Sequence, residues 1–205
     1  MMKRAATTRR AEPPARHLRA IGEPDAADLL AGARAGDEAT WELLVDRYSG
    51  VIWAIARAHR LDEATASDVS QVTWLRLVEH LDSVRDPQGL GAWLATTARR
   101  ECLRVIKAGR RDVLVDDDAL FEQGQPRPAG PEEAVLHSER EAALRRALES
   151  LPERCYRLLR VLLADPQPSY AEVSAALGMP LGSIGPVRAR CLACLRRSSE
   201  LREIV

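Results

Sequence analysis

The most evident absence in this sequence is a surplus of either charge. Its 205 residues include 30 Lys and Arg and 30 Asp and Glu, so the formal net charge is zero at pH 7. A protein that grips nucleic acid unaided normally carries a basic surplus. The balance therefore predicts either no nucleic-acid binding or binding that is local and assisted by a partner. Lysine is almost missing, since only Lys3 and Lys107 occur.

Long apolar runs are missing as well. No stretch reaches the roughly 18 apolar residues that a membrane-spanning helix needs, and residues 1–24 lack the apolar segment of a signal peptide. We therefore expect no membrane association and a cytoplasmic protein whose cysteines are reduced thiols. These are Cys102, Cys155, Cys191 and Cys194.

Residues arranged for catalysis or metal binding are also scarce. Cys191 and Cys194 have CxxC spacing, but no second CxxC or His pair lies nearby to complete the roughly four ligands of a zinc site. His59, His80 and His137 stand apart, and neither a Ser/His/Asp set nor a glycine-rich phosphate loop occurs. The sequence predicts no enzyme, no catalytic residue, no metal site and no cofactor.

What the sequence does contain is helical periodicity. Helices are expected at 25–35, after the caps Asp37 and Asp62, and at 92–107, with a break at 81–91. Tryptophans fall where these helices would meet. The pattern predicts a helical domain over 25–111, preceded by a disordered basic tail at 1–24.

The second half of the chain is also helical. Residues 112–131 combine acidic residues with three prolines, which is typical of an extended linker. Beyond it, Pro152 begins one helix, Ser169 begins a short helix through a capping box, and Ser183 is expected to cap the last helix, with Pro186 in its first turn. The fold class is all-α: two small helical domains, 25–111 and 132–205, joined by an acidic linker.

One helix suggests a docking surface. Trp74, Leu77, Val78 and Leu81 form an apolar stripe, and Leu75 falls on the other side among polar residues. An exposed leucine among charges is typical of a surface that binds another protein. A solvated face with one stray leucine is the alternative.

Two segments are candidates for DNA contact. The helix at 92–107 carries a basic face, which is either a phosphate-binding stripe or a solvated surface. Residues 169–197 have the proportions of a helix-turn-helix, although short helix pairs joined by glycine are common. The inward residues of its second helix would be Ile184, Val187, Cys191 and Leu195.

These motifs together resemble the extracytoplasmic-function (ECF) sigma factors, the two-domain group of the sigma-70 family. The similarity spans about residues 28–197 and rests on "AGDEATWELLVDRY", "DVSQVTWLRLVEHL", "WLATTARRECLR", "LESLPERCYRLLRVLL" and "SYAEVSAALGMPLGSI". The resemblance implies an RNA polymerase initiation factor. Its partners would be core polymerase (β′ clamp helices and β flap), promoter DNA and, as a further candidate, an anti-sigma factor.

The resemblance also implies residue roles. Binding to the β′ clamp helices would involve Asp68, Gln71, Val72, Leu75 and Arg76, where Val72 replaces a common acid. Contacts to the minus-ten strand would come from Arg99, Arg100, Arg104 and Lys107. Contacts to the minus-thirty-five element would come from Ser183, Gly185, Pro186, Arg188, Ala189 and Arg190.

Two other classes remain open from the sequence. One is a stand-alone helix-turn-helix regulator, although no dimerisation helix is evident for reading paired half-sites. The other is a degenerate sigma-like protein that acts only through an anti-sigma partner. The unusual Gly185-Pro186 opening of the last helix keeps this second class open, because it supplies few base-edge donors.

Overall fold

The computed structural model describes residues 25–112 and 142–199, and its regular elements there are all helical. This confirms the all-α fold class. The tail expected at 1–24 and all but the first residue of the linker expected at 112–131 lie outside the described residues.

The first three helices begin where the sequence places their caps. They are α1 (Ala26–Arg34), α2 (Glu38–Ala58) and α3 (Glu63–His80). Asp25 accepts a hydrogen bond from the Ala27 N–H at 2.7 Å, and Asp62 accepts one from the Thr65 N–H at 2.7 Å. Such carboxylates satisfy the free N–H groups of a first turn and favour its dipole.

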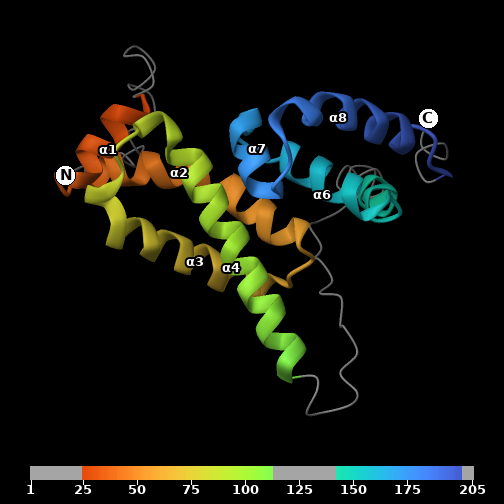
Figure 1. Cartoon of the computed structure of the whole chain (residues 1–205), viewed down its shortest axis with the longest axis horizontal. Helices are drawn as coiled ribbons and strands as arrows, with labels where there is room; N and C mark the ends of the chain where they lie inside the picture. Colours follow the sequence, from red (N-terminus) through yellow and green to blue (C-terminus); the bar gives the residue numbers. More distant parts are fainter. Residues whose placement is uncertain (1–24, 113–141, 200–205) are drawn as a thin grey trace, which may run out of the picture.

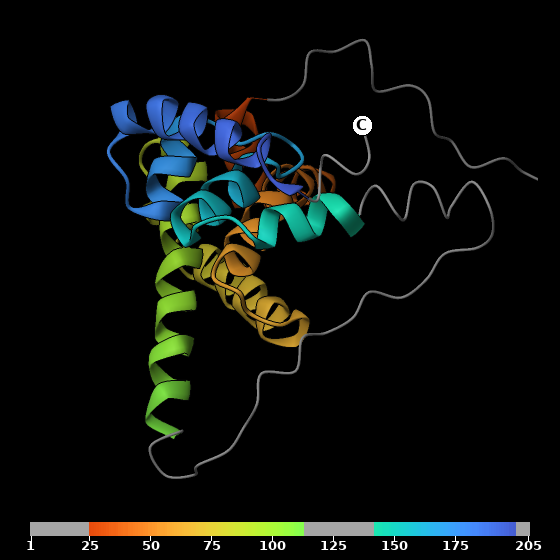
Figure 2. The same ribbon diagram turned by 90° about the vertical axis from the view of Figure 1, so that its right-hand side faces the viewer.

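A break of two short 3₁₀ turns follows, η1 (Leu81–Ser83) and η2 (Pro87–Gly89). Arg34 of α1 fixes the break by donating from Nη2 to the Leu81 carbonyl at 3.1 Å. The next helix, α4 (Leu90–Asp112), is longer than the sequence predicts at both ends. Its C-terminal half projects from the body of the molecule in both views (Figures 1 and 2).

The second group of helices starts with a helix at 142–149 and continues with α6 (Glu153–Leu162), α7 (Tyr170–Leu177) and α8 (Leu181–Leu195). The predicted capping box is present: the Ser169 N–H donates to Glu172 at 2.6 Å, and Ser169 Oγ accepts from the Glu172 N–H at 3.3 Å. Gly178 ends α7 in the left-handed conformation (φ +63°), which favours glycine.

The start of α8 differs from the prediction. Ser183 is not the cap, because α8 begins at Leu181 after an extended Pro180, whose carbonyl accepts from the Ser183 N–H at 2.9 Å. Ser183 Oγ donates to the same carbonyl at 2.7 Å. Pro186 is therefore in the helix interior rather than in the first turn, and it leaves the carbonyl of Gly182 without its usual donor.

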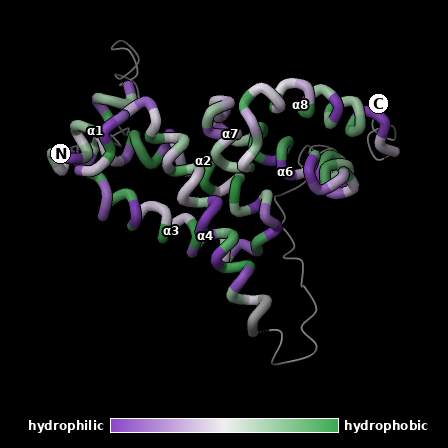
Figure 3. The backbone as a smooth tube through the Cα atoms, viewed as in Figure 1, coloured by the Kyte–Doolittle hydropathy of each residue, from purple (hydrophilic) through white to green (hydrophobic). Residues whose placement is uncertain are grey.

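The two groups of helices share one hydrophobic core. In Figure 1, α6 lies against α2 and α7 against α4 instead of standing apart, and α8 packs on α6 and α7. Buried leucines and alanines of both groups belong to a single cluster, and the hydropathy of α3 and α4 alternates along the chain as expected for helices with one buried side (Figure 3). A sequence reading of two modules joined by a linker does not anticipate this packing.

Glycines make the contact between the groups close. Gly50 of α2 packs against the backbone carbonyl of Asp165, and Gly91 of α4 packs against the Glu172 carboxylate, with no room for a Cβ at either glycine. A Cβ at position 50 would meet backbone and force the two segments apart, whereas the Glu172 carboxylate beside Gly91 is the end of a flexible side chain and could shift. The close approach therefore depends mainly on the absence of a side chain at position 50.

Polar contacts also cross between the groups. Arg60 Nε lies 3.0 Å from Glu153 Oε2, and the Arg60 guanidinium lies 4.3 Å from the centre of the Tyr156 ring. The Tyr156 hydroxyl donates to the Arg57 carbonyl at 3.2 Å. These contacts fix the C-terminal end of α2 against α6.

The cysteines depart from the expected reduced state. Cys155 of α6 and Cys191 of α8 are joined by a disulfide with a Cα–Cα distance of 5.2 Å. Cys194 is a free, half-buried thiol that packs against the core. Cys102 is a buried free thiol, and burial raises its pKa to about 12.

Candidate functional site

The outer side of α3 presents the residues that sequence analysis assigns to docking. Asp68, Gln71 and Arg76 are exposed, Leu75 is 57% exposed, and Val72 is half-buried. We call these five residues the α3 face. They share one side of the helix because their spacing of three and four residues matches its turn.

The apolar stripe predicted for α3 is wrong in part. The buried residues are Ala66, Val69, Thr73 and Leu77, whereas Val78 is 56% exposed. Thr73 can occupy a core position despite its polarity, because its hydroxyl is paired: it donates to the Val69 carbonyl at 2.7 Å. Val78 therefore adds to the apolar surface beside Leu75.

Trp74 lies at the edge of this helix, half-buried. Its ring meets the Trp41 ring of α2 edge-on, with centroids 6.1 Å apart. Arg76 Nη1 lies 3.2 Å from Glu79 Oε2, and both side chains are about half exposed. An ion pair at this exposure contributes little to stability, so it leaves both groups available to a partner.

The basic face of α4 is divided between two environments. Arg100, Arg104 and Lys107 are exposed, whereas Arg99 is half-buried beneath α7. A Cβ on Gly178 would lie 2.9 Å from Arg99 Nη2, so the guanidinium lies directly against the turn after α7. We call these four basic residues the α4 face.

Glu101 is a nearly buried carboxylate beside the α4 face. It is 9% exposed, and its Oε2 lies 2.6 Å from Arg104 Nε. Arg104 is therefore partly neutralised by its neighbour. Arg100 and Lys107 make no hydrogen bond or ion pair with the described part of the chain.

Helix α8 has the expected inner side. Ile184, Val187 and Cys191 are buried, and Leu195 is half-buried. Arg188 Nη1 lies 3.4 Å from the Tyr170 hydroxyl, which links α8 to α7. The residues predicted to face DNA divide by exposure: Pro186, Arg188, Ala189 and Arg190 are exposed, and Ser183 and Gly185 are half-buried.

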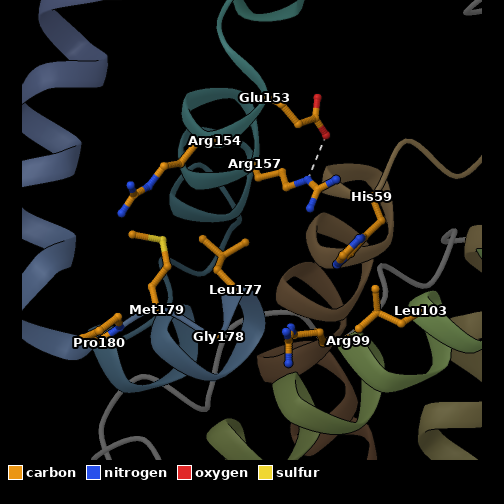
Figure 4. Close-up of a pocket in the computed structure, with 10 residues that line it drawn as sticks. All are labelled: His59, Arg99, Leu103, Glu153, Arg154, Arg157, Leu177, Gly178, Met179 and Pro180. Atoms are coloured by element: carbon orange, nitrogen blue, oxygen red, sulfur yellow. Dashed lines mark hydrogen bonds and ion pairs between the residues drawn. The ribbon is translucent and has the colours of Figure 1, made fainter.

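Sequence reasoning missed a cavity at the junction of the two groups. It has a volume of about 540 Å³ and is lined by residues of α4, α6, the α7–α8 turn and the end of α2 (Figure 4). No sequence pattern could reveal it, because its residues come from four separated segments. Within residues 25–112 and 142–199, no three side chains gather as a metal site.

His59 borders this cavity and has an unusual environment. Burial, together with the positive charges of Arg157 and Arg99, lowers its pKa from 6.5 to about 4. Both ring nitrogens are buried without a hydrogen-bond partner among the described residues. The folded protein therefore holds this ring neutral at pH 7.

We expect His59 to make stability depend on pH between about 6.5 and 4. In this window the unfolded chain binds a proton that the folded chain does not, so the free energy of unfolding falls as pH is lowered. Urea unfolding at pH 7.5 and pH 5 should show a smaller loss for His59→Gln than for the wild type. His80→Gln is the control, since His80 is exposed. Equal losses in all three proteins would contradict the assignment.

Comparisons with known proteins cover both faces. A family profile described as Sigma-70 region 2 matches residues 44–112, which include the α3 face and the α4 face. The chain is also 28% identical over 163 residues to the ECF RNA polymerase sigma-E factor of Escherichia coli K12, covering 76% of this chain and 84% of that protein. The chain is thus similar in sequence to the ECF sigma factors of the sigma-70 family.

A second relative shows the same similarity. The ECF RNA polymerase sigma factor BldN of Streptomyces coelicolor is 28% identical over 188 residues, covering 88% of this chain and 69% of that protein. The match extends beyond the region 2 profile into the second group of helices. The similarity to ECF sigma factors thus spans most of the described residues.

Solved structures show the same fold. The sigma factor RpoE from Bartonella quintana, determined with the anti-sigma factor NepR, has a TM-score of 0.58 at 23% identity, covering 79% of this chain and 95% of that one. CnrH, determined with the cytosolic domain of CnrY, has a TM-score of 0.52 at 24% identity, covering 84% and 94%. At this identity the likeness concerns the fold alone.

None of the described helices is both long enough and apolar enough to cross a bilayer.

Proposed function

We propose that this protein is a sigma factor that binds core RNA polymerase through the α3 face and reads promoter DNA through the α4 face and α8. The observation that carries the proposal is the exposure of Leu75 beside Asp68 and Arg76, within the segment that matches Sigma-70 region 2. The protein acts by binding rather than by catalysis. Its zero net charge fits a factor whose DNA affinity comes mainly through polymerase.

The α3 face would dock on the clamp helices of the β′ subunit. Leu75 supplies an apolar anchor, and the surrounding polar residues supply orientation, which is the usual division between the centre and rim of an interface. Val78, exposed next to Leu75, widens the apolar centre. Half-buried Val72 would make the contact more apolar than an acid at that position would.

The DNA contacts would divide between two helices. Arg99, Arg100, Arg104 and Lys107 would hold the phosphates of the melted minus-ten strand. The α8 residues Ser183, Gly185, Pro186, Arg188, Ala189 and Arg190 would approach the minus-thirty-five element while the second group of helices rests on the β flap. Arg188 and Arg190 are the exposed donors suited to phosphates or guanine edges.

The packed arrangement limits these contacts in the free protein. Arg99 lies against Gly178, so it cannot reach a DNA strand while α7 covers α4. Binding to polymerase would therefore have to separate the two groups before all of the α4 face is available. This explains why DNA binding by the isolated chain should be weak.

An anti-sigma factor and a cytoplasmic location complete the proposal. The two solved sigma factors of similar fold were each determined with a partner, NepR or the cytosolic domain of CnrY. A chain with the same fold is a candidate for the same kind of restraint. The cytoplasm is the compartment in which it would meet polymerase.

Promoter binding with and without core polymerase tests the proposal. We expect weak binding of promoter duplex by the isolated protein at physiological salt, and strong binding together with run-off transcription when core enzyme is added. Tight binding by the isolated protein would favour a stand-alone regulator. Core binding without any run-off product over a promoter library would favour a sigma-like protein that only titrates partners. The Gly185-Pro186 opening of α8, which supplies few base-edge donors, is consistent with that class.

Replacement of Arg100 should weaken promoter opening. Arg100 is exposed and has no ion-pair partner within the described residues, so Arg100→Ala removes one phosphate contact without disturbing the core. Open-complex formation should fall several-fold, and the slope of log K against log salt should shrink by about one unit. Arg145→Ala, at an exposed position on the 142–149 helix, is the matched control. An Arg100→Ala protein with an unchanged salt slope would remove this residue from the α4 face.

A further inference from the structure

The cavity between the two groups of helices has the size of a small-molecule site. Its volume of about 540 Å³ falls within the range of roughly 300–1,000 Å³ that is usual for ligand pockets. Residues from α4 and α6 face each other across it, and the α7–α8 turn closes one side (Figure 4). Its apolar lining is Leu103, Leu177, Met179 and Pro180.

Positive charge is concentrated in this cavity. Three arginines line it, Arg99, Arg154 and Arg157, against one carboxylate, Glu153. That carboxylate is already engaged, because Arg157 Nε lies 2.8 Å from Oε1 and Arg60 Nε lies 3.0 Å from Oε2. Arg99 and Arg154 have neither a hydrogen bond nor an ion pair with any described residue. Two guanidinium groups are thus left without an anion.

An unpaired polar ring lies at the same place. Both nitrogens of His59 are shielded from solvent and have no partner in the described chain. Buried polar atoms are rarely left unpaired, since each one costs the free energy of a lost hydrogen bond. A neutral imidazole offers one donor and one acceptor, but neither nitrogen is open to the cavity, so His59 forms part of the wall and supplies no hydrogen bond to a ligand.

We propose that this cavity is a binding site for a small phosphate-bearing molecule of nucleotide size. The planar donor forks of Arg99 and Arg154 match phosphate oxygens, which would neutralise the unpaired charges. Leu177 and Met179 would cover the less polar part of the ligand, and His59 would form part of the wall.

The position of the site gives the ligand an effect on conformation. Arg99 belongs to the first group of helices and Arg154 to the second, so the cavity exists only while the groups are packed together. A ligand that binds only this arrangement stabilises it by mass action. The bound molecule would therefore hold α7 over Arg99.

Calorimetric titration of the full chain tests the proposal, with sodium pyrophosphate and ATP as separate probes at constant ionic strength. We expect saturable one-to-one binding by at least one probe. Arg154→Gln should weaken this binding about tenfold or more, because it removes a charge-assisted hydrogen bond. Arg145→Gln should leave it unchanged, since Arg145 is an exposed arginine outside the cavity. Circular dichroism establishes that both variants are folded.

Three results would overturn the site. The first is the absence of saturable binding by both probes, and the second is equal weakening by Arg154→Gln and Arg145→Gln. The third is binding of a single-stranded oligonucleotide, but of neither probe, that depends on Arg154, because the groove would then hold a polymer. The assay contains neither polymerase nor promoter, so its outcome is independent of the proposed sigma-factor function.

Discussion

A protein carrying Leu75→Asp is expected to lose binding to core RNA polymerase by about 100-fold or more, while keeping its fold. Leu75 is 57% exposed, so the new carboxylate remains hydrated in the free protein. In the complex the same carboxylate would have to be desolvated at the centre of the α3 face, which costs several kcal/mol if it finds no partner. Fluorescence anisotropy of labelled protein with core enzyme measures the change.

Leu43→Asp is the matched control for this substitution. Leu43 of α2 is 42% exposed, and it lies on the side of that helix away from Trp41, which contacts α3. The same change in charge and size should therefore leave polymerase binding within about threefold, as is usual for residues outside an interface. Equal losses for both variants would mean that the effect comes from net charge and that the α3 face is not the docking surface.

Gly50→Ala is expected to open the contact between the two groups of helices. The added methyl group has no room beside the Asp165 carbonyl, so α2 and the turn after α6 must move apart. Overpacking of a close contact costs about 1–3 kcal/mol. The free energy of unfolding in urea should fall by this amount, and the radius of gyration from small-angle scattering should rise.

Gly109→Ala provides a control of opposite sign. Gly109 lies in α4 with nothing near the position of a Cβ, so alanine there gains helix propensity without a clash. We expect stabilisation by about 0.5–1 kcal/mol and no change in the radius of gyration. If Gly50→Ala behaved like Gly109→Ala, the packed arrangement would not be the solution state.

Local signals in the sequence predict the helices well. Four helices begin directly after a residue whose side-chain oxygen accepts hydrogen bonds from the free N–H groups of the first turn: Asp25, Asp37, Asp62 and Ser169. The exposed position of the α3 face follows from the helical period of the apolar residues. The last helix departs from this rule because Pro180, rather than the Ser183 side chain, sets where α8 begins.

Contacts between distant segments could not be predicted in this way. Hydrophobic periodicity shows that one side of α4 is buried. It does not show which helices pack against that side, whether earlier or later in the chain. Gly50 and Gly91 give no local sign of this packing. A glycine within a helical segment only lowers the predicted helix propensity, and its packing partner is known only from the structure. The cavity and the pairing of Cys155 with Cys191 depend on the same long-range packing.

The link between Cys155 and Cys191 bears on how the molecule comes apart. It ties α6 to α8 covalently, whereas the boundary between α4 and α7 has no such tie among the described residues. If the C-terminal helices were pulled, α7 would therefore separate from α4 before α6 separates from α8. In the oxidised protein the C-terminal helices would leave as a preassembled unit, with α8 already oriented, and their release would require no refolding.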